Sequence, residues 1–266
     1  MASVASCLIH KEIYNNFWNI IIFLKLKKMK FLKKIATDTE AVQKKHRVVY
    51  YNNSNQKICY REPFKWVDLG LESGTKWANM NLGAVTEADY GDYYMWGSTQ
   101  ANTDTICDWS THPFNDGTNQ FNSTYFNAHK SEWLNTDDKG YPILKPEYDA
   151  VYQATNGTAH MPTYEQFTEL KTKTNRRTVS NYNGTGISGM KFISMTDSSK
   201  FIFIPDSGYR NYQTFSYQGQ YGYLWCTRLD KEYLQQAYYS DSDFQTMNYR
   251  FMDTGLAIRP VLTPQS

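Results

Sequence analysis

Residues 161–170 read Met-Pro-Thr-Tyr-Glu-Gln-Phe-Thr-Glu-Leu and contain the clearest start of a helix in this chain. Thr163 and Gln166 have the spacing of a capping box, in which each side chain satisfies a backbone N–H group that the first helical turn leaves without an acceptor. Pro162 suits the entry to a helix, and Phe167 and Leu170 supply an apolar face. The stretch therefore predicts a helix that begins at Thr163.

Strand patterns dominate the chain after this helix. Four further short strands are expected beyond a core hairpin, and the predicted strands are Met190–Met195, Lys200–Ile204, Tyr221–Thr227, Gln236–Tyr239, Phe244–Tyr249 and Ala257–Val261. On the other side of the capping box, residues 145–154 place Tyr148, Val151 and Tyr152 at helical spacing and predict another helix. Helices followed by a run of strands indicate an α+β fold.

The remaining chain suggests three parts, with boundaries at 1–28, 29–63 and 64–266. Val48–Tyr51 and Lys57–Tyr60 flank an Asn-rich turn and predict a β-hairpin connector that ends at Pro63. Residues 64–266 are expected to form the main domain. Within it, residues 98–142 are polar and poor in aliphatic side chains, so we expect a long insertion of loops there.

The first 28 residues fit no targeting signal well. The apolar run Phe17–Leu26 is too short to span a membrane, and its basic residues follow it rather than precede it, unlike those of a signal peptide. Two interpretations stay open: a disordered tail, or an upstream stretch with translation beginning at Met29.

Composition limits the function classes. Aromatic residues make up 16% of the 266 residues and include 22 Tyr, which argues against a disordered chain. Tyrosine is used on half-buried strands and also on exposed recognition surfaces, and composition alone leaves both readings open. Basic residues are concentrated in residues 1–48, so the rest of the chain has no basic stripe and no nucleic-acid partner is expected for it.

Catalytic and metal motifs are not found. The chain has no phosphate-binding glycine loop, no HExxH and no nucleophile elbow, and its five histidines are isolated. The acidic pairs Asp137–Asp138 and Asp241–Asp243 could bind Ca²⁺, with a solvated loop as the alternative. Spacing leaves a Cys59–Cys107 bridge open, and Cys226 is expected to be a buried apolar group rather than a reactive thiol. No cofactor is therefore predicted.

Seven motifs occur in an order that resembles one known family. They are Val67–Leu71 with Lys76–Ala78, Gly83–Ala84, Tyr90–Gly97, Met161–Leu170, Phe201–Pro205 with Gly208–Arg210, Gly222–Trp225, and Gly255–Val261. This set resembles the Fibrobacter succinogenes major paralogous domain, which is related to formylglycine-generating enzymes and to variable proteins diversified by retroelements. The resemblance implies a C-type-lectin-like α+β fold with two helices and a small mixed or antiparallel sheet, rich in loops.

The same resemblance implies a non-enzymatic ligand-binding surface on the C-terminal strands and loops. Residues expected to bind there are Asn211, Tyr212, Tyr217, Gln218, Tyr221, Tyr238, Tyr239, Asp241, Asn248 and Tyr249. Tyr223 and Trp225 are expected in the core, while Gly208, Arg210, Gly255 and Arg259 are assigned to the framework. The sequence departs from the family's usual pattern at Ala159-His160 and at Leu224–Thr227.

Three functions follow for comparison. The first is an adhesin-like module on a phage tail or cell surface that binds a host glycan or protein, with no membrane span and with its N-terminal segment docked to a larger assembly. The second is a structural decoration domain. The third, an oxidase, is disfavoured because Cys226 lacks the second nearby cysteine that such redox chemistry requires.

Overall fold

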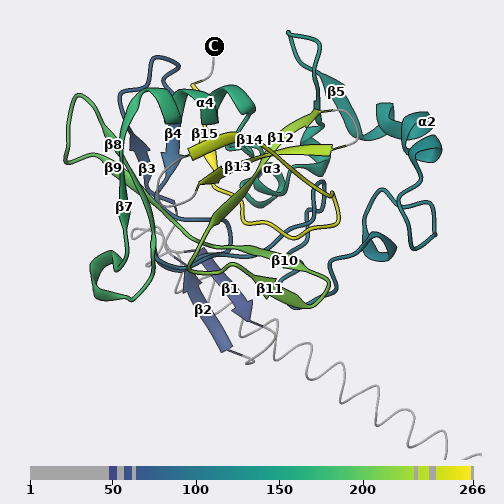
Figure 1. Ribbon diagram of the computed structural model, residues 1–266, viewed down its shortest axis with the longest axis horizontal. Helices are drawn as coiled ribbons and strands as arrows, with labels where there is room; N and C mark the ends of the chain where they lie inside the picture. Colours follow the sequence, from purple (N-terminus) through teal and green to yellow (C-terminus); the bar gives the residue numbers. More distant parts are fainter. Residues whose placement is uncertain (1–47, 53–56, 62–63, 231–232, 240–243, 265–266) are drawn as a thin grey trace, which may run out of the picture. The chain divides into compact units, whose positions relative to one another are not determined.

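The computed structural model describes residues 48–52, 57–61, 64–230, 233–239 and 244–264 (Figure 1). The chain divides into two units, residues 1–63 and residues 64–266. In the first unit, β1 (Val48–Asn52) pairs antiparallel with β2 (Lys57–Arg61), which confirms the two expected strands. The expectations for residues 1–47 and for the turn at 53–56 lie outside the described residues.

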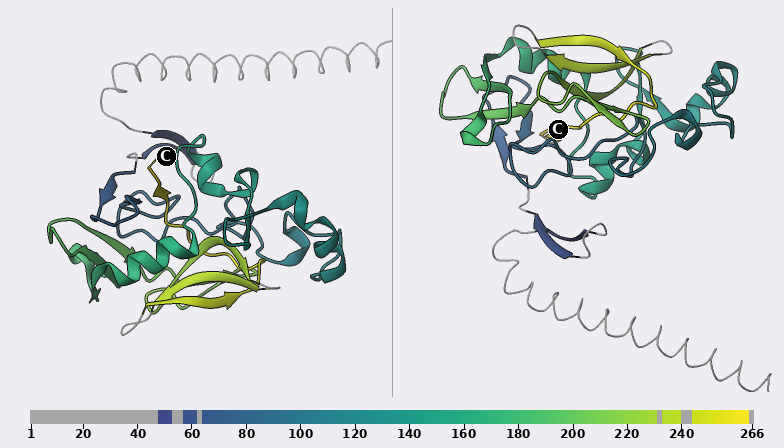
Figure 2. Two further views of the ribbon diagram at one scale, coloured as in Figure 1. Left: turned by 90° about the horizontal axis from the view of Figure 1, so that it is seen from above. Right: turned by 60° about the horizontal axis from the view of Figure 1, so that its bottom comes forward.

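The second unit combines short helices with small antiparallel sheets (Figures 1 and 2). Its elements are β3 (Trp66–Asp68), β4 (Lys76–Ala78), η2 (Trp109–Thr111), α2 (Ser123–Trp133), β5 (Leu134–Thr136), β6 (Pro142–Leu144), η3 (Pro146–Tyr148), α3 (Ala150–Ala154), α4 (Tyr164–Thr172), β7 (Thr174–Val179), η4 (Tyr182–Gly184), β8 (Gly189–Ser194), β9 (Phe201–Pro205), β10 (Tyr209–Asn211), β11 (Thr214–Ser216), β12 (Gly222–Asp230), β13 (Tyr233–Tyr239), β14 (Phe244–Arg250) and β15 (Val261–Leu262). This composition confirms the α+β class. The expectation of two helices and one small sheet needs correction, because the described residues of this unit form three α-helices, α2, α3 and α4, and several small sheets.

These strands form four sheets in the second unit. Their orders are β14-β13-β12-β6-β5, β15-β4-β3, β7-β8-β9 and β10-β11, and every pairing is antiparallel. None of these sheets closes into a barrel within the described part of the chain. Val67 and Val261 both lie opposite Trp77, so the first and last strands of the unit meet on the two sides of β4.

Helix α4 begins where the capping box predicts. The Gln166 N–H group donates to the Thr163 hydroxyl oxygen at 3.2 Å, and the Thr163 N–H group donates to Gln166 Oε1 at 2.9 Å. Phe167 and Leu170 are buried, and the Phe167 ring packs 5.3 Å from that of Trp77. The apolar face thus fixes α4 against the three-stranded sheet that joins both ends of the unit.

Three expectations about secondary structure need correction. Residues 98–142 are not only loops, because α2, β5 and β6 lie there; Phe126 and Trp133 are the buried anchors of a helix that is otherwise polar. The helix expected at 145–154 is interrupted at Asp149, whose carboxylate caps α3 by accepting from Val151 and Tyr152 N–H groups. The polar strand β7 was not expected, because it has no alternation of apolar residues.

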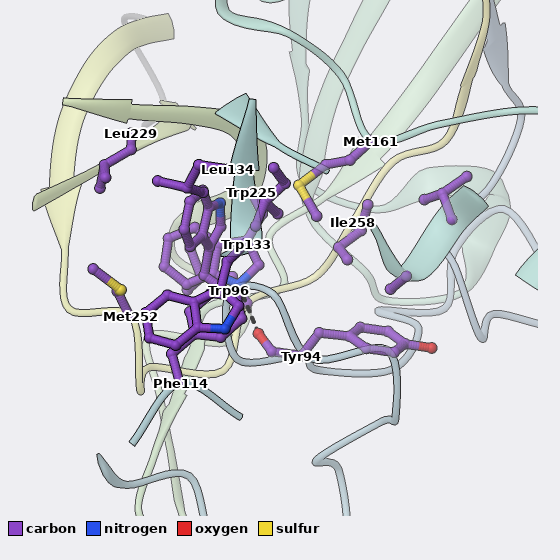
Figure 3. Packing of buried hydrophobic residues seen from close by; sticks show 14 of the residues in the cluster. Tyr94, Trp96, Phe114, Trp133, Leu134, Met161, Trp225, Leu229, Met252 and Ile258 are labelled. Carbon is purple, nitrogen blue, oxygen red and sulfur yellow. Dashed lines mark hydrogen bonds between the residues drawn. The ribbon is translucent and has the colours of Figure 1, made fainter. Parts of the chain in front are cut away.

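Strand β12 separates two hydrophobic clusters. Successive side chains of a strand point to opposite faces, so Tyr223 and Trp225 enter one cluster while Leu224 and Cys226 enter the other. Trp225 Nε1 donates to the Tyr94 carbonyl at 2.6 Å, shown as a dashed line in Figure 3. Trp96 Nε1 donates in return to the Cys226 carbonyl at 2.9 Å. The core positions expected for Tyr223, Trp225 and Cys226 are confirmed.

A fully buried arginine links residues 78–81 to strand β9. Arg259 donates from Nε to Asn81 Oδ1 at 2.9 Å, from Nη1 to the Ala78 carbonyl at 3.0 Å, and from Nη2 to the Phe203 carbonyl at 2.8 Å. A guanidinium group presents its donors in a fixed planar fork, which suits acceptors that lie in different directions. Its framework assignment is therefore confirmed.

Replacing Arg259 tests the importance of this fork. We expect Arg259→Met to lower the free energy of unfolding by about 3 kcal/mol, because buried acceptors lose their donors. Arg259→Lys keeps the charge but is expected to lose about 2 kcal/mol, since one ammonium group cannot reach all three acceptors. Urea unfolding followed by circular dichroism measures the stability of both variants. The control is Lys76→Gln, which removes the charge of an exposed residue. Wild-type stability of Arg259→Lys would contradict the proposed role of the fork.

A buried histidine makes stability depend on pH. His112 stacks on Trp109 at 4.5 Å, and its Nδ1 accepts from the Phe114 N–H group at 3.1 Å, which requires the neutral ring. Burial lowers the pKa of His112 to about 3, below the ordinary value of about 6.5. The unfolded chain therefore binds a proton that the folded chain does not, so the stability present above pH 6.5 is lost as the pH falls.

We expect the titration of His112 to lower the free energy of unfolding of the wild-type protein by about 2 kcal/mol between pH 6.5 and pH 5. His112→Asn keeps an acceptor for the Phe114 N–H group without a titrating ring, so that part of the loss is expected to disappear. Urea titrations at both pH values measure the free energy of unfolding. The control is His129→Gln, which removes one imidazole from α2 and leaves His112 in place. Equal pH dependence in wild type and His112→Asn would refute the assignment.

Candidate functional site

The β10–β11 hairpin forms the centre of the candidate site (Figure 1). Arg210 donates from Nε and Nη2 to the Thr105 carbonyl at 3.3 and 3.0 Å. The Tyr212 N–H group donates to the Cys107 carbonyl at 2.8 Å, and the Cys107 N–H group donates back at 3.0 Å. These four bonds hold the hairpin against residues 105–107, so its turn is presented from a fixed base.

Two glycines make this close approach feasible. Gly208 has φ +59°, and a Cβ atom there would lie 2.1 Å from the Ser216 carbonyl oxygen. A Cβ on Gly255 would lie 2.9 Å from Cys107 Sγ, where Gly255 pairs with Arg210. Both contacts are too short for any side chain. The framework assignments of Gly208, Arg210 and Gly255 are confirmed.

Next to the hairpin, four tyrosines and one arginine form what we call the tyrosine cluster: Tyr209, Tyr217, Tyr221, Tyr223 and Arg250. Ring centroids lie 5.7 Å apart for 209–217, 5.4 Å for 217–221 and 5.4 Å for 209–223. The Arg250 guanidinium carbon lies 4.3 Å from the Tyr209 ring centroid and 4.8 Å from that of Tyr223. The cluster runs from the buried Tyr223 to Tyr217, which is 46% exposed.

Two exposed tyrosines have an unusual backbone. Tyr212 has φ +55° and Tyr217 has φ +59°, the left-handed region that bulky residues rarely occupy. Tyr212 is 53% exposed, so burial of its ring does not explain the conformation. Strained conformations of this kind concentrate at binding sites, where surrounding structure holds them in place. The two tyrosines therefore mark this surface as a candidate site.

The structure brings together only some of the predicted site residues. Tyr217 and Tyr221 are in ring contact, and Asn211 and Tyr212 are exposed at the turn of the hairpin. Gln218 has a framework contact, because its Nε2 donates to the Tyr93 hydroxyl at 2.8 Å. Asp241 lies outside the described residues, as do the side chains of Tyr238, Tyr239, Asn248 and Tyr249. The backbone of the latter four belongs to β13 and β14.

Sequence reasoning did not assign four residues to the site: Tyr209 and Arg250 belong to the tyrosine cluster, Phe215 belongs to the β10–β11 hairpin, and Phe251 follows Arg250 in the chain. Phe215 is 39% exposed and packs edge-on against Tyr93 at 5.0 Å, with the Arg210 guanidinium 4.7 Å from its ring centroid. Phe251 is 66% exposed. Their signal was available, because each lies among the dense aromatics of residues 207–251. Cation–π contacts between residues about 40 positions apart could not be read from that pattern.

The cysteines are enclosed rather than reactive. Cys226 is buried in β12, and burial raises the pKa of its thiol to about 12. Cys107 is likewise buried, and burial raises the pKa of its thiol to about 11. Cys107 carries a free thiol in the structure. The side chain of Cys59, the partner in the bridge that spacing left open, lies outside the described residues. Thiol chemistry depends on the thiolate, so neither group is activated at neutral pH.

The expected calcium ligands are only partly described. Asp137 Oδ1 accepts from the N–H groups of Lys139 and Tyr141, at 3.0 and 2.7 Å, and thereby shapes its own loop. Asp241 and Asp243 lie outside the described residues. Over the part of the chain that the structure describes, no group of three His, Cys, Asp or Glu residues is arranged to hold a metal ion.

Comparisons with protein-family models, curated proteins and solved structures gave no match. Among the described residues, no helix has both the length and the apolar character needed to cross a membrane. The residues of the candidate site are therefore assigned from the geometry of this chain alone.

A substitution at Tyr212 tests whether its positive φ angle stores backbone strain. Asparagine tolerates left-handed φ values, so Tyr212→Asn is expected to raise the free energy of unfolding by about 0.5–1 kcal/mol. Tyr212→Ala also removes the ring but keeps the steric conflict of an ordinary Cβ, and should give no such gain. Urea unfolding compares the two variants. Identical stabilities for Asn and Ala would argue against stored strain at this position.

Proposed function

We propose that this protein is a non-enzymatic binding module that recognises a glycan or protein on a target cell surface. The observation that supports this most directly is that two exposed tyrosines have positive φ angles: Tyr212 at the turn of the hairpin anchored by Arg210, and Tyr217 directly after its second strand. Tyrosine offers a flat apolar face and a hydroxyl group at small entropic cost, which suits recognition. A rigid base reduces the ordering cost of binding.

The proposal extends to a C-type-lectin-like fold and to a place on a phage tail or cell surface. The family resemblance of the seven motifs supports both, and the α+β architecture is compatible with that fold. Residues 29–63 would then dock to a larger fibre or surface assembly. Retroelement-driven diversification of residues 207–251 is part of the same proposal, supported by their many Tyr, Asn, Ser and Asp residues.

Enzymatic activity has no comparable support. The oxidase alternative required a reactive Cys226, whose thiol is buried with a raised pKa. A decoration domain without a ligand stays the alternative outcome of the binding experiments below.

The tyrosine surface predicts a specific loss of binding. The experiment screens the protein on a glycan array and on intact bacterial cells by flow cytometry, then repeats both with the double variant Tyr212→Ala/Tyr217→Ala. Central aromatic residues of an interface contribute about 2 kcal/mol or more, so affinity should fall about 30-fold. Tyr152→Ala, which removes a comparably exposed tyrosine on α3, should bind like wild type.

Two outcomes would contradict the proposal. Unchanged affinity of the double variant for an identified ligand would show that binding lies elsewhere on the molecule. Absence of any ligand on arrays and cells, combined with incorporation of the protein into a particle or fibre, would favour the decoration function.

A further inference from the structure

A second surface, remote in sequence from the tyrosine cluster, combines a groove with two cations. The groove has a volume of about 350 Å³ and is lined by Arg177, Lys191 and the segment Thr178–Asn183. This volume is at the lower end of the range for small-molecule sites. Its lining residues belong to strands β7 and β8 of the β7-β8-β9 sheet and to the η4 segment that follows β7.

The two cations are direct neighbours across the sheet. Arg177 of β7 lies opposite Lys191 of β8 in the antiparallel register. Like charges in directly opposed positions destabilise a sheet. Neither side chain forms an ion pair with a carboxylate of the described residues. Sheet formation therefore does not account for this pair.

Protection of a sheet edge does not account for it either. Edge strands often carry lysine or arginine, which discourages pairing with another chain, and that purpose could explain Arg177 on the edge strand β7. Lys191 is on the central strand β8 and is half-buried, where no edge needs protection. Its Nζ lies 4.1 Å from the Phe201 ring centroid and 5.2 Å from that of Tyr182. These rings hold the ammonium group at the groove.

The rest of the lining combines the apolar Val179 with an aromatic ring held in place and with several polar side chains. The Tyr182 ring stacks on Phe203 with centroids 3.9 Å apart and an interplanar angle of 1°. Its hydroxyl donates to Glu87 Oε2 at 2.6 Å, and Glu87 Oε1 also accepts from Asn79, so both oxygens of this carboxylate already have hydrogen-bond donors. Thr178, Ser180, Asn181 and Asn183 add hydroxyl and amide groups to the lining.

We propose that this groove binds an acidic saccharide through its carboxylate or sulfate group. Arg177 and Lys191 would donate charge-assisted hydrogen bonds to the oxyanion. The hydroxyl and amide groups of residues 178–183 would bind sugar hydroxyls, and a single sugar ring fits the volume. The site shares no residue with the tyrosine cluster, so it goes beyond the proposed function and does not depend on it.

Matched sugars test the ligand chemistry. Titrations of the isotope-labelled full chain, followed by amide NMR signals, compare glucuronate, glucose 6-sulfate, glucose and inorganic sulfate. We expect glucuronate or glucose 6-sulfate to shift signals of residues 177–183 and 191, with at least about tenfold weaker effects of glucose and of inorganic sulfate. Equal affinity for inorganic sulfate would overturn the saccharide assignment, and absence of shifts at these residues with every acid would overturn the site.

Matched variants test the residues. Arg177→Gln and Lys191→Met, which keeps apolar packing on the rings, should each weaken binding about tenfold. Arg176→Gln removes the same charge from the adjacent position of β7, whose side chain points to the opposite face of the sheet, and should change affinity less than about twofold. If Arg176→Gln weakens binding as much as Arg177→Gln, the attraction is diffuse and the proposed site is wrong.

Discussion

The hydrogen bonds of the buried Arg259 guanidinium group are the constraint on which the main domain depends. They join the end of β4 at Ala78 and the following loop at Asn81 to strand β9 at Phe203, more than a hundred residues further along the chain. A cation without access to water must have its donors satisfied. The three acceptors must therefore stay within hydrogen-bond distance of the guanidinium group. Asn81 extends the arrangement by donating to the Tyr90 carbonyl at 2.8 Å.

From this centre the framework extends through β12 to the candidate site. Trp96 and Trp225 exchange indole N–H bonds with the backbone of the opposite segment, which fixes Tyr94–Trp96 against the strand. The two hydrophobic clusters therefore pack against opposite faces of β12, and neither can repack without moving the other. The β10–β11 hairpin is held to the same body through Arg210 and Tyr212.

The two candidate surfaces differ in their physical chemistry. The tyrosine cluster presents ring faces next to a single guanidinium group, and its member Tyr217, like Tyr212 at the turn of the hairpin, has a positive φ angle. The groove beside β7 and β8 instead presents paired cations among hydroxyl and amide groups. A surface of rings favours flat apolar contact, whereas paired cations favour an oxyanion. One domain thus carries two candidate surfaces of different chemical character.

The amino-acid pattern alone determined the α+β class, the capped start of α4, the core hairpin of β8 and β9, and the inward position of Trp225. Each depends on spacing within one element, and such spacing is visible in sequence. It did not predict α2, whose few anchors are aromatic, or the polar strand β7, which pairs with β8 without an apolar alternation of its own. Only the tertiary structure decided that Arg250 stacks among tyrosines, that Gln218 binds Tyr93, and that Arg177 faces Lys191. These contacts join residues distant in sequence, and their geometry is set by packing and strand register rather than by local preference.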